Sequence, residues 1–567
     1  MPAGLAGLAT QTGVLGTSNF MRTVNYYDDK YRLIQTTSDN GAGGKDRITK
    51  ILTFDGKTSS DYHSHTSRFY TTPIVTQQAY SYDHMDRLLT VTHKIGNQET
   101  VTITQNTYNE LGQLLNKKIH QSPSHPNPLQ KLDYYYNIRG WLTGINRPSS
   151  TQTGYEESDL FNLQLNYNTV MFTGLSVPQY NGNITEVGWK SGYDEYVRGF
   201  TFKYDKANRL NASTYAYLGA NDYGPQWIFT KRYQEDDIQY DRNGNLKTFD
   251  RYHGDWNKID YLNYLNYKGN HLGRVEDWSG SNSPVGFQDA NDGSGYDYDY
   301  DANGNSVFDL NKNSMAITYN YLNLPVTMSI PNKGTITYTY DAAGNKLQKS
   351  TFDQIAGKTT NYYYAGDYVY RNDTLEFISQ PEGRLRPVRI DTTQAISIAN
   401  LKYIYDYFLK DHLGSVRSVL TTEQQTDFYA ATMETAAAAK EDALFSNVSA
   451  TASAKPTGMT NDNNNQKASK LNGDVSITGN KRVGPAIVLK VMAGDTISLS
   501  AWSWYTGAVQ APASGVADIA TELLPLLTGG VAGNGGTHGG AIPSSTSDPL
   551  LGTALAHFLS NNRPYVN

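Results

Sequence analysis

Three residues that could act in acid–base chemistry lie within the stretch KDHLGSVR, residues 410–417. Asp411 and His412 are neighbours, a pairing that can move protons, and Arg417 follows closely. No serine or cysteine nucleophile is indicated beside them, because Ser415 belongs to a Gly-Ser pair typical of a turn. The alternative is structural: Asp411 starts a hairpin turn, Arg417 pairs with an acidic neighbour, and the chain returns as a strand. We favour the structural interpretation.

A second group of acidic residues, in DYDYDANGN, has the spacing of a calcium-binding loop. Its carboxylates are Asp297, Asp299 and Asp301. Such a loop also needs a glycine at its sixth position and an acidic residue at its twelfth. Counted from Asp301, these positions hold Ser306 and Lys312. We therefore favour a strand with tyrosines on one face and aspartates on the other, which ends in a turn.

Two histidines, His63 and His65, are two positions apart in DYHSHTS and would share one face of a strand. A zinc site needs at least a third ligand, for which His120 and His125 are available. Nothing in the sequence places these four residues near one another. The alternative, which we favour, is that they are solvated loop histidines.

The segment WSWY places Trp502 and Trp504 on one face of a predicted strand. If they were exposed, the two rings could stack on the sugar rings of a glycan. If they were buried, they would belong to the core of a sandwich-like module, and this is the interpretation we favour. No residue pattern indicates a cofactor site, and we predict no cofactor.

The elements that must position these residues are clearest in YTYDAAGNKLQKSTF, residues 338–352. Threonines alternate with apolar and aromatic residues before Asp341, and this period-two pattern of β-forming residues predicts a strand. The Asp341 carboxylate can accept hydrogen bonds from the next backbone amides and fix a turn. Gly344 can adopt the positive φ that a hairpin loop with a bulge requires. Apolar alternation restarts at Leu347, so the unit is one β-hairpin.

Variants of this hairpin recur along the chain at irregular spacing. They begin at Tyr26, Tyr80, Thr107, Tyr134, Phe202, Ile238 and Tyr296. Helical patterns are almost absent before residue 420. We therefore predict that residues 20–420 form a continuous antiparallel sheet that coils on itself, which would limit open strand edges.

The composition favours a sheet that is wet on at least one side. Tyrosine is in excess, with 44 Tyr against 17 Phe, and a buried hydroxyl needs a hydrogen-bond partner. We interpret this excess as a thin sheet around a watery interior or as a broad binding face. The 567-residue chain has no cysteine, so disulfides cannot hold it together. Its net charge of −6 is spread without a basic stripe, which argues against nucleic acid as a partner.

No segment has the pattern of a transmembrane span or of a secretory signal peptide. The most apolar stretch, VADIATELLPLLTGGVAG, carries Asp518 and Glu522. The first residues, MPAGLAGLATQTGV, lack a basic region and a long apolar core. We therefore expect either another export signal or a native N-terminus outside this sequence.

The character of the sequence changes after about residue 420. An Ala-rich piece that could be helical and several polar loops come first. The stretch GPAIVLKVMAGDTISLSAWSWYTG then predicts two strands around a tight turn. From Gly507 onward the chain is rich in Gly, Ala and Ser, as in a linker or a mobile tail.

The recurring hairpins resemble the YD (RHS) repeats of bacterial secreted toxins. The stretch YFLKDHLGSVRSVL, residues 407–420, is similar to the start of the RHS repeat-associated core motif. The resemblance covers roughly residues 20–420. The part from Phe428 to Thr506 is similar to a segment that follows this motif in RHS proteins of Bacteroidota.

This resemblance implies a hollow β-shell, or cocoon, in which a spiralling sheet encloses a C-terminal effector, often a toxin. Many members release the effector by aspartate-dependent self-cleavage, with paired DPxG-like motifs after DHLG. Here the pair is missing, and SDPLLG, from Ser547, holds a single Asp-Pro. Self-cleavage is therefore not expected. Family members act in competition between bacteria or against eukaryotic hosts, and related shells in animals serve cell adhesion.

The sequence thus predicts an all-β chain: a coiled antiparallel YD-repeat β-hairpin shell, then a small β-rich, sandwich-like module and a flexible tail. The expected divisions are an N-terminal linker at 1–19, the repeat shell at 20–406, the core motif at 407–420, the accessory module at 421–510 and the tail at 511–567.

The expected function is a non-catalytic, secreted or cell-surface shell that holds or presents an effector. The expected partners are that enclosed or tethered polypeptide and the secretion or cell-surface machinery, with no nucleic acid and no transmembrane segment. The alternative is an extracellular adhesin or glycan binder that uses the tyrosine-rich faces and the two tryptophans. A third, weaker hypothesis is a self-processing protease that uses Asp411.

Overall fold

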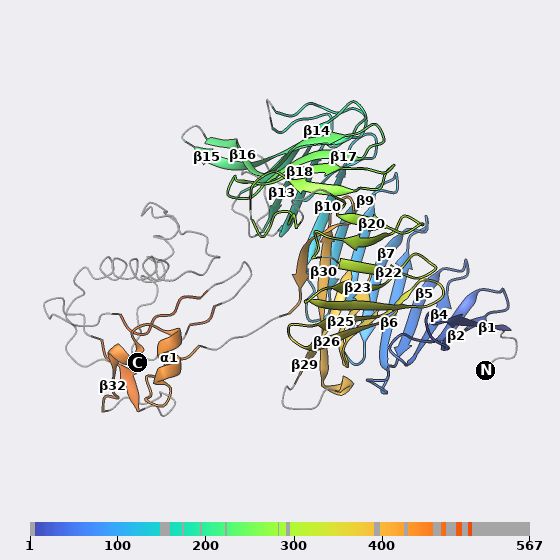
Figure 1. Cartoon of the computed structure of the whole chain (residues 1–567). Coiled ribbons are helices and arrows are strands. Elements are labelled where there is room, and N and C mark those ends of the chain that lie inside the picture. The colour runs from blue at the N-terminus through green and yellow to red at the C-terminus, as the bar shows by residue number, and fades with distance from the viewer. Residues whose placement is uncertain are drawn as a thin grey trace. The chain divides into compact units, whose positions relative to one another are not determined.

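The structure is a computed structural model of the chain, shown in Figure 1. It describes residues 6–499 and 501, except at 148–158, 173–174, 193–195, 222–223, 282, 291–294, 314, 391–396, 424–428, 458–465, 472–482, 490–496 and 500. The chain divides into two compact units, Met1–Glu423 and Gln424–Asn567. Each is described by itself.

The first unit consists of two antiparallel sheets of 19 and 12 strands, in which each strand pairs with the next along the chain. The first sheet contains β1 (Ala6–Gly13), β2 (Phe20–Tyr27), β3 (Leu33–Asp39), β4 (Lys45–Leu52), β5 (Thr58–His65), β6 (Ile74–Tyr82), β7 (Leu88–Ile95), β8 (Val101–Tyr108), β9 (Leu114–Gln121), β10 (Gln130–Tyr136), β11 (Leu142–Ile145), β12 (Phe161–Asn166), β13 (Glu186–Ser191), β14 (Arg198–Tyr204), β15 (Leu210–Asn221), β16 (Gly224–Tyr240), β17 (Leu246–Tyr252), β18 (Lys258–Leu265) and β19 (Arg274–Asp277).

The second sheet contains β20 (Tyr298–Tyr300), β21 (Ser306–Asp309), β22 (Met315–Tyr319), β23 (Pro325–Ile330), β24 (Gly334–Tyr340), β25 (Lys346–Asp353), β26 (Lys358–Ala365), β27 (Tyr368–Arg371), β28 (Thr374–Gln380), β29 (Gly383–Arg389), β30 (Leu401–Lys410) and β31 (Val416–Thr421), with one 3-10 turn at Ile398–Asn400. The prediction of an all-β repeat region is confirmed. Neither sheet closes on itself.

The repeating turn is built by one carboxylate. Asp341 Oδ1 accepts the backbone N–H groups of Ala343 and Asn345 at 3.0 and 2.8 Å, and its Oδ2 accepts the Asn345 side-chain amide at 2.9 Å. Gly344 has φ +87°, as the predicted bulged loop requires. The same turn, with Asp or Asn in first position, recurs at Asp28, Asp83, Asn109, Asn137, Asp205, Asp241, Asp301, Asn320 and Asp411.

At most of these turns, the tyrosine before the turn residue ties the turn to the hairpin before it. The Tyr340 hydroxyl donates to the backbone carbonyl of Pro325 at 3.0 Å. Equivalent bonds join Tyr82 to Thr58, Tyr108 to Leu88, Tyr136 to Leu114, Tyr204 to Ile184, Tyr240 to Leu210, Tyr300 to Leu272 and Tyr319 to Ser306. These hydroxyls therefore bond to protein backbone, whereas the sequence interpretation assigned the excess of tyrosine to a watery interior or a binding face.

Part of the first sheet packs on part of the second, and we call this contact the seam. It involves strands β5–β12 of the first sheet and strands β26–β31 of the second. Its buried members include Ile74, Val91, Ile95, Val101, Ile103, Ile119, Leu132, Leu163, Leu165, Tyr368, Tyr370, Leu375, Ile378, Leu385, Tyr403, Tyr405, Tyr407 and Leu409. The two sheets pack against each other through these buried side chains, so neither sheet faces water along its whole length.

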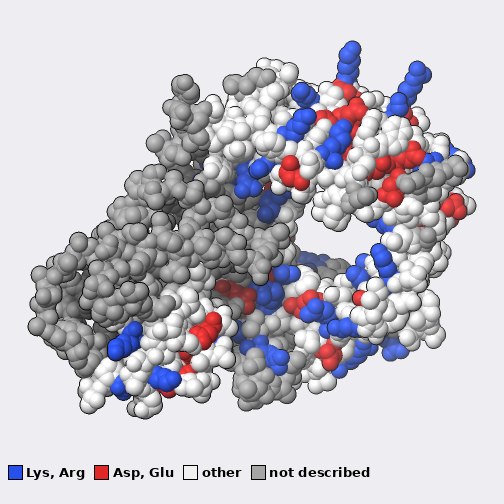
Figure 2. Space-filling view, turned by 60° about the vertical axis from the view of Figure 1, so that its left-hand side comes forward, with Lys and Arg blue, Asp and Glu red and all other residues white. Residues whose placement is uncertain are grey.

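A hollow opens elsewhere in the surface of this unit. Figure 2 shows it at the right of the view, bordered above and below by described residues.

A backbone contact also joins the start of the first sheet to the second: Val14 forms a β-bridge with Asp341. The Ala342 amide donates to the Gly13 carbonyl at 2.7 Å.

The described part of the second unit holds two short helices, α1 (Ala438–Leu444) and α2 (Val448–Thr451), and a pair of strands, β32 (Ala452–Ala454) and β33 (Lys467–Ser469). The Ala-rich piece therefore forms a helix, as its composition allows. Most of the two strands expected between 484 and 507, and the whole tail 511–567, lie outside the described residues. Among the described helices, none has both the length and the apolar character needed to cross a membrane.

Candidate functional site

Three histidines of the first sheet meet three tyrosines of the second across the seam. The hydrogen-bonded pairs are His65 Nε2 with Tyr370 Oη (2.8 Å), His93 Nδ1 with Tyr405 Oη (2.8 Å), and His120 Nδ1 with Tyr407 Oη (3.0 Å). The partners are between 287 and 312 positions apart in the chain. All six side chains are buried.

The strands explain why these rings meet. Residues two apart on a strand share a face, so Tyr403, Tyr405 and Tyr407 of β30 point the same way, toward the first sheet. His93 and His120 lie at the far ends of β7 and β9, where the core of the seam begins. Tyr405 and Tyr407 thus each have a ring nitrogen within reach, whereas the Tyr403 hydroxyl has no hydrogen-bond partner among the described residues.

Burial sets the charge of two of these histidines. It lowers the pKa of His93 to about 4. Burial, followed by the nearby charge of His125, lowers the pKa of His120 to about 4, although Glu99 acts in the opposite direction. Both rings are therefore neutral near pH 7, and each can accept a hydrogen bond from its tyrosine.

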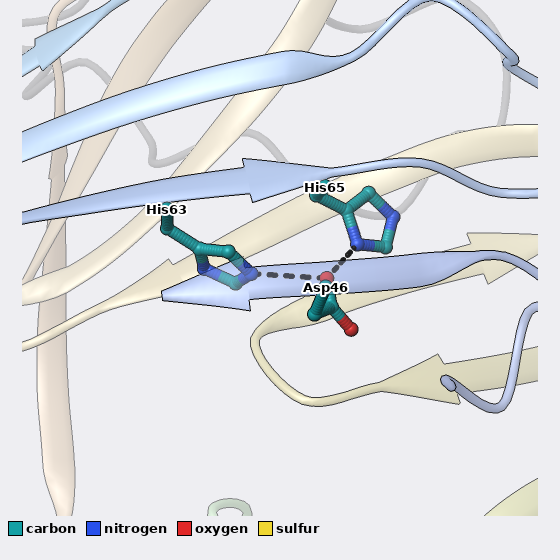
Figure 3. A group of neighbouring side chains, drawn as sticks. All are labelled: Asp46, His63 and His65. Atoms are coloured by element: carbon teal, nitrogen blue, oxygen red, sulfur yellow. Dashed lines mark hydrogen bonds and ion pairs between the residues drawn. The ribbon is translucent and has the colours of Figure 1, made fainter. Parts of the chain in front are cut away.

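A second pair of contacts extends from His65 within the first sheet. Figure 3 shows His63 and His65, from β5, pointing at Asp46 of β4. The distances to Asp46 Oδ1 are 3.0 Å from His63 Nε2 and 2.5 Å from His65 Nδ1. One ligand atom from each of the three side chains lies within 4.8 Å of the others. In the part of the chain that the structure describes, this is the one group of three or more His, Cys, Asp or Glu residues with such a spacing.

Strand register produces this group. Asp46 is the direct cross-strand partner of His65, and Ile48 is the partner of His63, so Asp46 and both histidines lie on one face. His65 is fully buried, and 13% of the His63 side chain is exposed. Burial alone would raise the pKa of Asp46, but hydrogen bonds from the two histidines hold it below its usual value.

The surroundings of the group are aromatic on one side and acidic on another. The Tyr368 ring stacks on His65, with ring centres 3.7 Å apart, and meets His63 edge-on at 5.1 Å. The carboxylates of Asp61 and Asp367 are close enough to His63 to interact with its charge. Loss of water contact raises the pKa of both carboxyl groups.

The expectation for His63 and His65 as solvated loop residues is wrong, because both lie in β5 and face the seam. The third ligand available to them is Asp46, which the sequence analysis missed. His120 and His125 lie near each other, with ring centres 6.3 Å apart, at another point of the seam. Asp46 is the second residue of β4, and only the register of β4 with β5 places it beside the two histidines.

The predicted residues of KDHLGSVR lie in a repeat turn. Asp411 Oδ1 accepts the backbone N–H groups of Leu413 and Ser415, and its Oδ2 accepts Arg417 Nε at 2.6 Å. His412 is exposed. The Asp411 carboxylate bonds to these three donors and not to His412. The geometry matches the structural interpretation of this stretch.

The three aspartates of DYDYDANGN have separate partners. Asp297 is buried and accepts the Val275 amide and the Asn311 side chain. Asp299 is exposed in β20, between two half-buried tyrosines. Asp301 holds a repeat turn. The arrangement matches a strand that ends in a turn. Trp502 and Trp504 lie outside the described residues, so the favoured core role and the alternative glycan-binding role both stay predictions.

Residues 6–423 thus define an antiparallel β-repeat protein whose unit is a hairpin closed by a Tyr-Asp turn. No family model matches the chain, and no curated protein matches it. Among solved structures, it is similar to TcdB2-TccC3, with 14% identity over 74% of this chain and a TM-score of 0.44. It is similar to TcdB2-TccC3 without the hypervariable C-terminal region at 14% identity over 73% of this chain, with a TM-score of 0.43.

The chain spans about a quarter of the length of these chains, 24% and 23% respectively. A porin-like protein from Bacteroides uniformis ATCC 8492 matches 40% of this chain and 93% of its own, with 12% identity and a TM-score of 0.16.

Proposed function

We propose that the repeat region is a non-catalytic wall that encloses or presents an effector polypeptide, either C-terminal to the repeats or separate. The observation that carries this proposal is the seam. It fastens β5, β7 and β9 to β27 and β30, roughly 300 positions later in the chain. The chain between these strands must therefore leave the seam and return to it, which is the path that a wall around a space requires.

The sequence motifs support the same function. The Tyr-Asp turns and DHLGSVR resemble those of RHS shells, and the contacts of Asp411, which build a repeat turn, support a non-catalytic role. We further propose that the protein acts outside the cell or at its surface, and that its cargo takes part in competition between bacteria.

The packed seam also favours a second candidate, an adhesin or glycan binder with a solid core. Two sheets joined by buried aliphatic and aromatic side chains form a rigid support for a binding surface. In this alternative the Trp502 and Trp504 rings would bind sugars.

Particle imaging of the full chain by electron microscopy tests the two functions against each other. A wall around cargo predicts low density inside the repeat region and slow proteolysis across residues 20–420. A filled particle, together with glycan binding that Trp502→Ala and Trp504→Ala remove, would support the adhesin and overturn the wall. The intact mass of the chain, beside Asp411→Asn, tests self-processing: we expect one unprocessed mass for both.

A further inference from the structure

We propose that Asp46, His63 and His65 form a binding site for one divalent transition-metal ion, with Zn²⁺ as the best fit. Two imidazoles and one carboxylate are the ligand set of open zinc sites, which leave a fourth position for water. The proposal goes beyond the wall function and does not depend on cargo.

The geometry favours an ion. Zinc lies about 2.0–2.2 Å from nitrogen and oxygen ligands. The three ligand atoms already lie within 4.8 Å of one another, so small side-chain rotations bring them to bonding distance of one point. The two histidines belong to one strand and Asp46 to its paired neighbour, so a rigid sheet holds all three. The partly exposed edge of His63 gives water and the ion a route in.

The outer contacts of His65 suit a metal ligand. Without metal, a carboxylate can only accept, so the Nδ1 of His65 carries the proton and its Nε2 accepts the Tyr370 hydroxyl. When Nδ1 binds an ion, the proton moves to Nε2, and the Tyr370 oxygen becomes the acceptor. A hydrogen bond from the ring nitrogen that does not bind the metal is typical of metal-bound histidines. The exchange needs no net loss of a proton from the ring.

The local charge also favours a cation. The carboxylates of Asp61 and Asp367 also lie near His63, so the site is surrounded by more acidic groups than its single ligand carboxylate. The alternative is a metal-free network in which Asp46 simply accepts two N–H bonds.

Metal binding to the full chain, made without a histidine tag and treated with chelator, tests the proposal. We expect one Zn²⁺ per chain after dialysis, and a Co²⁺ form with the visible absorption of a four-coordinate site. His63→Gln should weaken Zn²⁺ binding by more than about 100-fold, since loss of an outer contact alone typically gives 10- to 100-fold. Tyr370→Phe should weaken it by about 10-fold or more.

His253→Gln is the matched control, because His253 forms an exposed pair with Asp255 at 3.1 Å and no third ligand is grouped with them. It should leave the stoichiometry and the Co²⁺ spectrum unchanged. A wild-type chain that binds no Zn²⁺ would overturn the proposal whether or not the variants fold. So would binding that His63→Gln, folded by circular dichroism, leaves intact.

Discussion

The hydroxyl of Tyr240 donates to the backbone carbonyl of Leu210 across 2.8 Å, and this bond fastens the Asp241 turn to the hairpin before it. The Asp241 carboxylate meanwhile holds its own turn, by accepting the Asn243 and Asn245 amides. The two adjacent residues of the Tyr-Asp pair therefore stabilise different parts of the structure. Aspartate closes one hairpin, and tyrosine joins it to the previous one.

Tyr240→Phe should weaken this connection without changing the fold. The variant keeps the ring and loses one hydrogen bond, which contributes about 0.5–1.5 kcal/mol. We expect faster hydrogen exchange of backbone amides at residues 240–246 and a similarly small loss of stability to denaturant. Tyr321→Phe is the control, because this side chain is 74% exposed. Equal effects of the two variants would contradict the role given to the tyrosine.

Asp301→Ala should destabilise its hairpin by about 1–2 kcal/mol, since the carboxylate accepts two backbone amides and the Asn305 side chain. Asp299→Ala, two residues earlier and exposed, should change stability by less than about 0.5 kcal/mol. Denaturant unfolding measures both. If these residues bound calcium instead, excess calcium would stabilise the wild type and both substitutions would remove the effect.

Much of the local structure could be predicted from the sequence. The strand, the Asp341 carboxylate turn and the positive φ of Gly344 follow from neighbouring residue types, and so does the pairing of Arg417 with Asp411. These contacts span few positions, so a short segment contains all the groups that determine them.

The seam could not be predicted in this way. His93 and Tyr405 are 312 positions apart, and neither residue type indicates the other. Separation along the chain also explains why the tyrosines were assigned to a watery interior or a binding face. Their hydroxyls bond to backbone carbonyls of a neighbouring hairpin, so a short segment does not contain both partners. Asp46 is a charged residue after two glycines and a lysine, a context typical of a solvated loop, and only strand register brings it to His65.

The ion pair across the seam should be energetically coupled. Lys117 Nζ of β9 lies 2.7 Å from Glu382 Oε1, and both line a cavity of about 60 Å³ beside Tyr407. Removing one partner leaves a partly buried charge uncompensated. We expect Lys117→Met and Glu382→Gln each to destabilise the chain by about 1–3 kcal/mol, and the double variant by less than their sum.

The coupling in this double-mutant cycle should reach about 1 kcal/mol. Lys131 and Asp133 form the control pair, 2.8 Å apart on one strand and less buried than the seam pair. Their coupling should be below about 0.5 kcal/mol. A seam pair that couples no better than this surface pair would show that the Lys117–Glu382 ion pair does not help to hold the two sheets together.

The neutral histidines of the seam should make the chain less stable in acid. Burial lowers the pKa of His93 and of His120 from 6.5 to about 4, so the unfolded chain binds more protons than the folded chain between these values. Stability from the two rings is fully present above about pH 6.5 and is lost as the pH falls toward 4. The groups that face His120, namely His125, Glu99 and the Tyr405 and Tyr407 rings, leave this direction unchanged.

Unfolding by denaturant at pH 7 and pH 5 measures this loss, which should be about 1–2 kcal/mol for each histidine. His93→Asn and His120→Asn keep an acceptor near the tyrosine hydroxyl but cannot take up a proton. Each should therefore reduce the difference in stability between pH 7 and pH 5, even where it lowers stability at both. His84→Gln, at an exposed turn, should leave that difference unchanged. If the Asn variants showed the full pH dependence of the wild type, carboxylates elsewhere would account for it and the seam would not respond to acid.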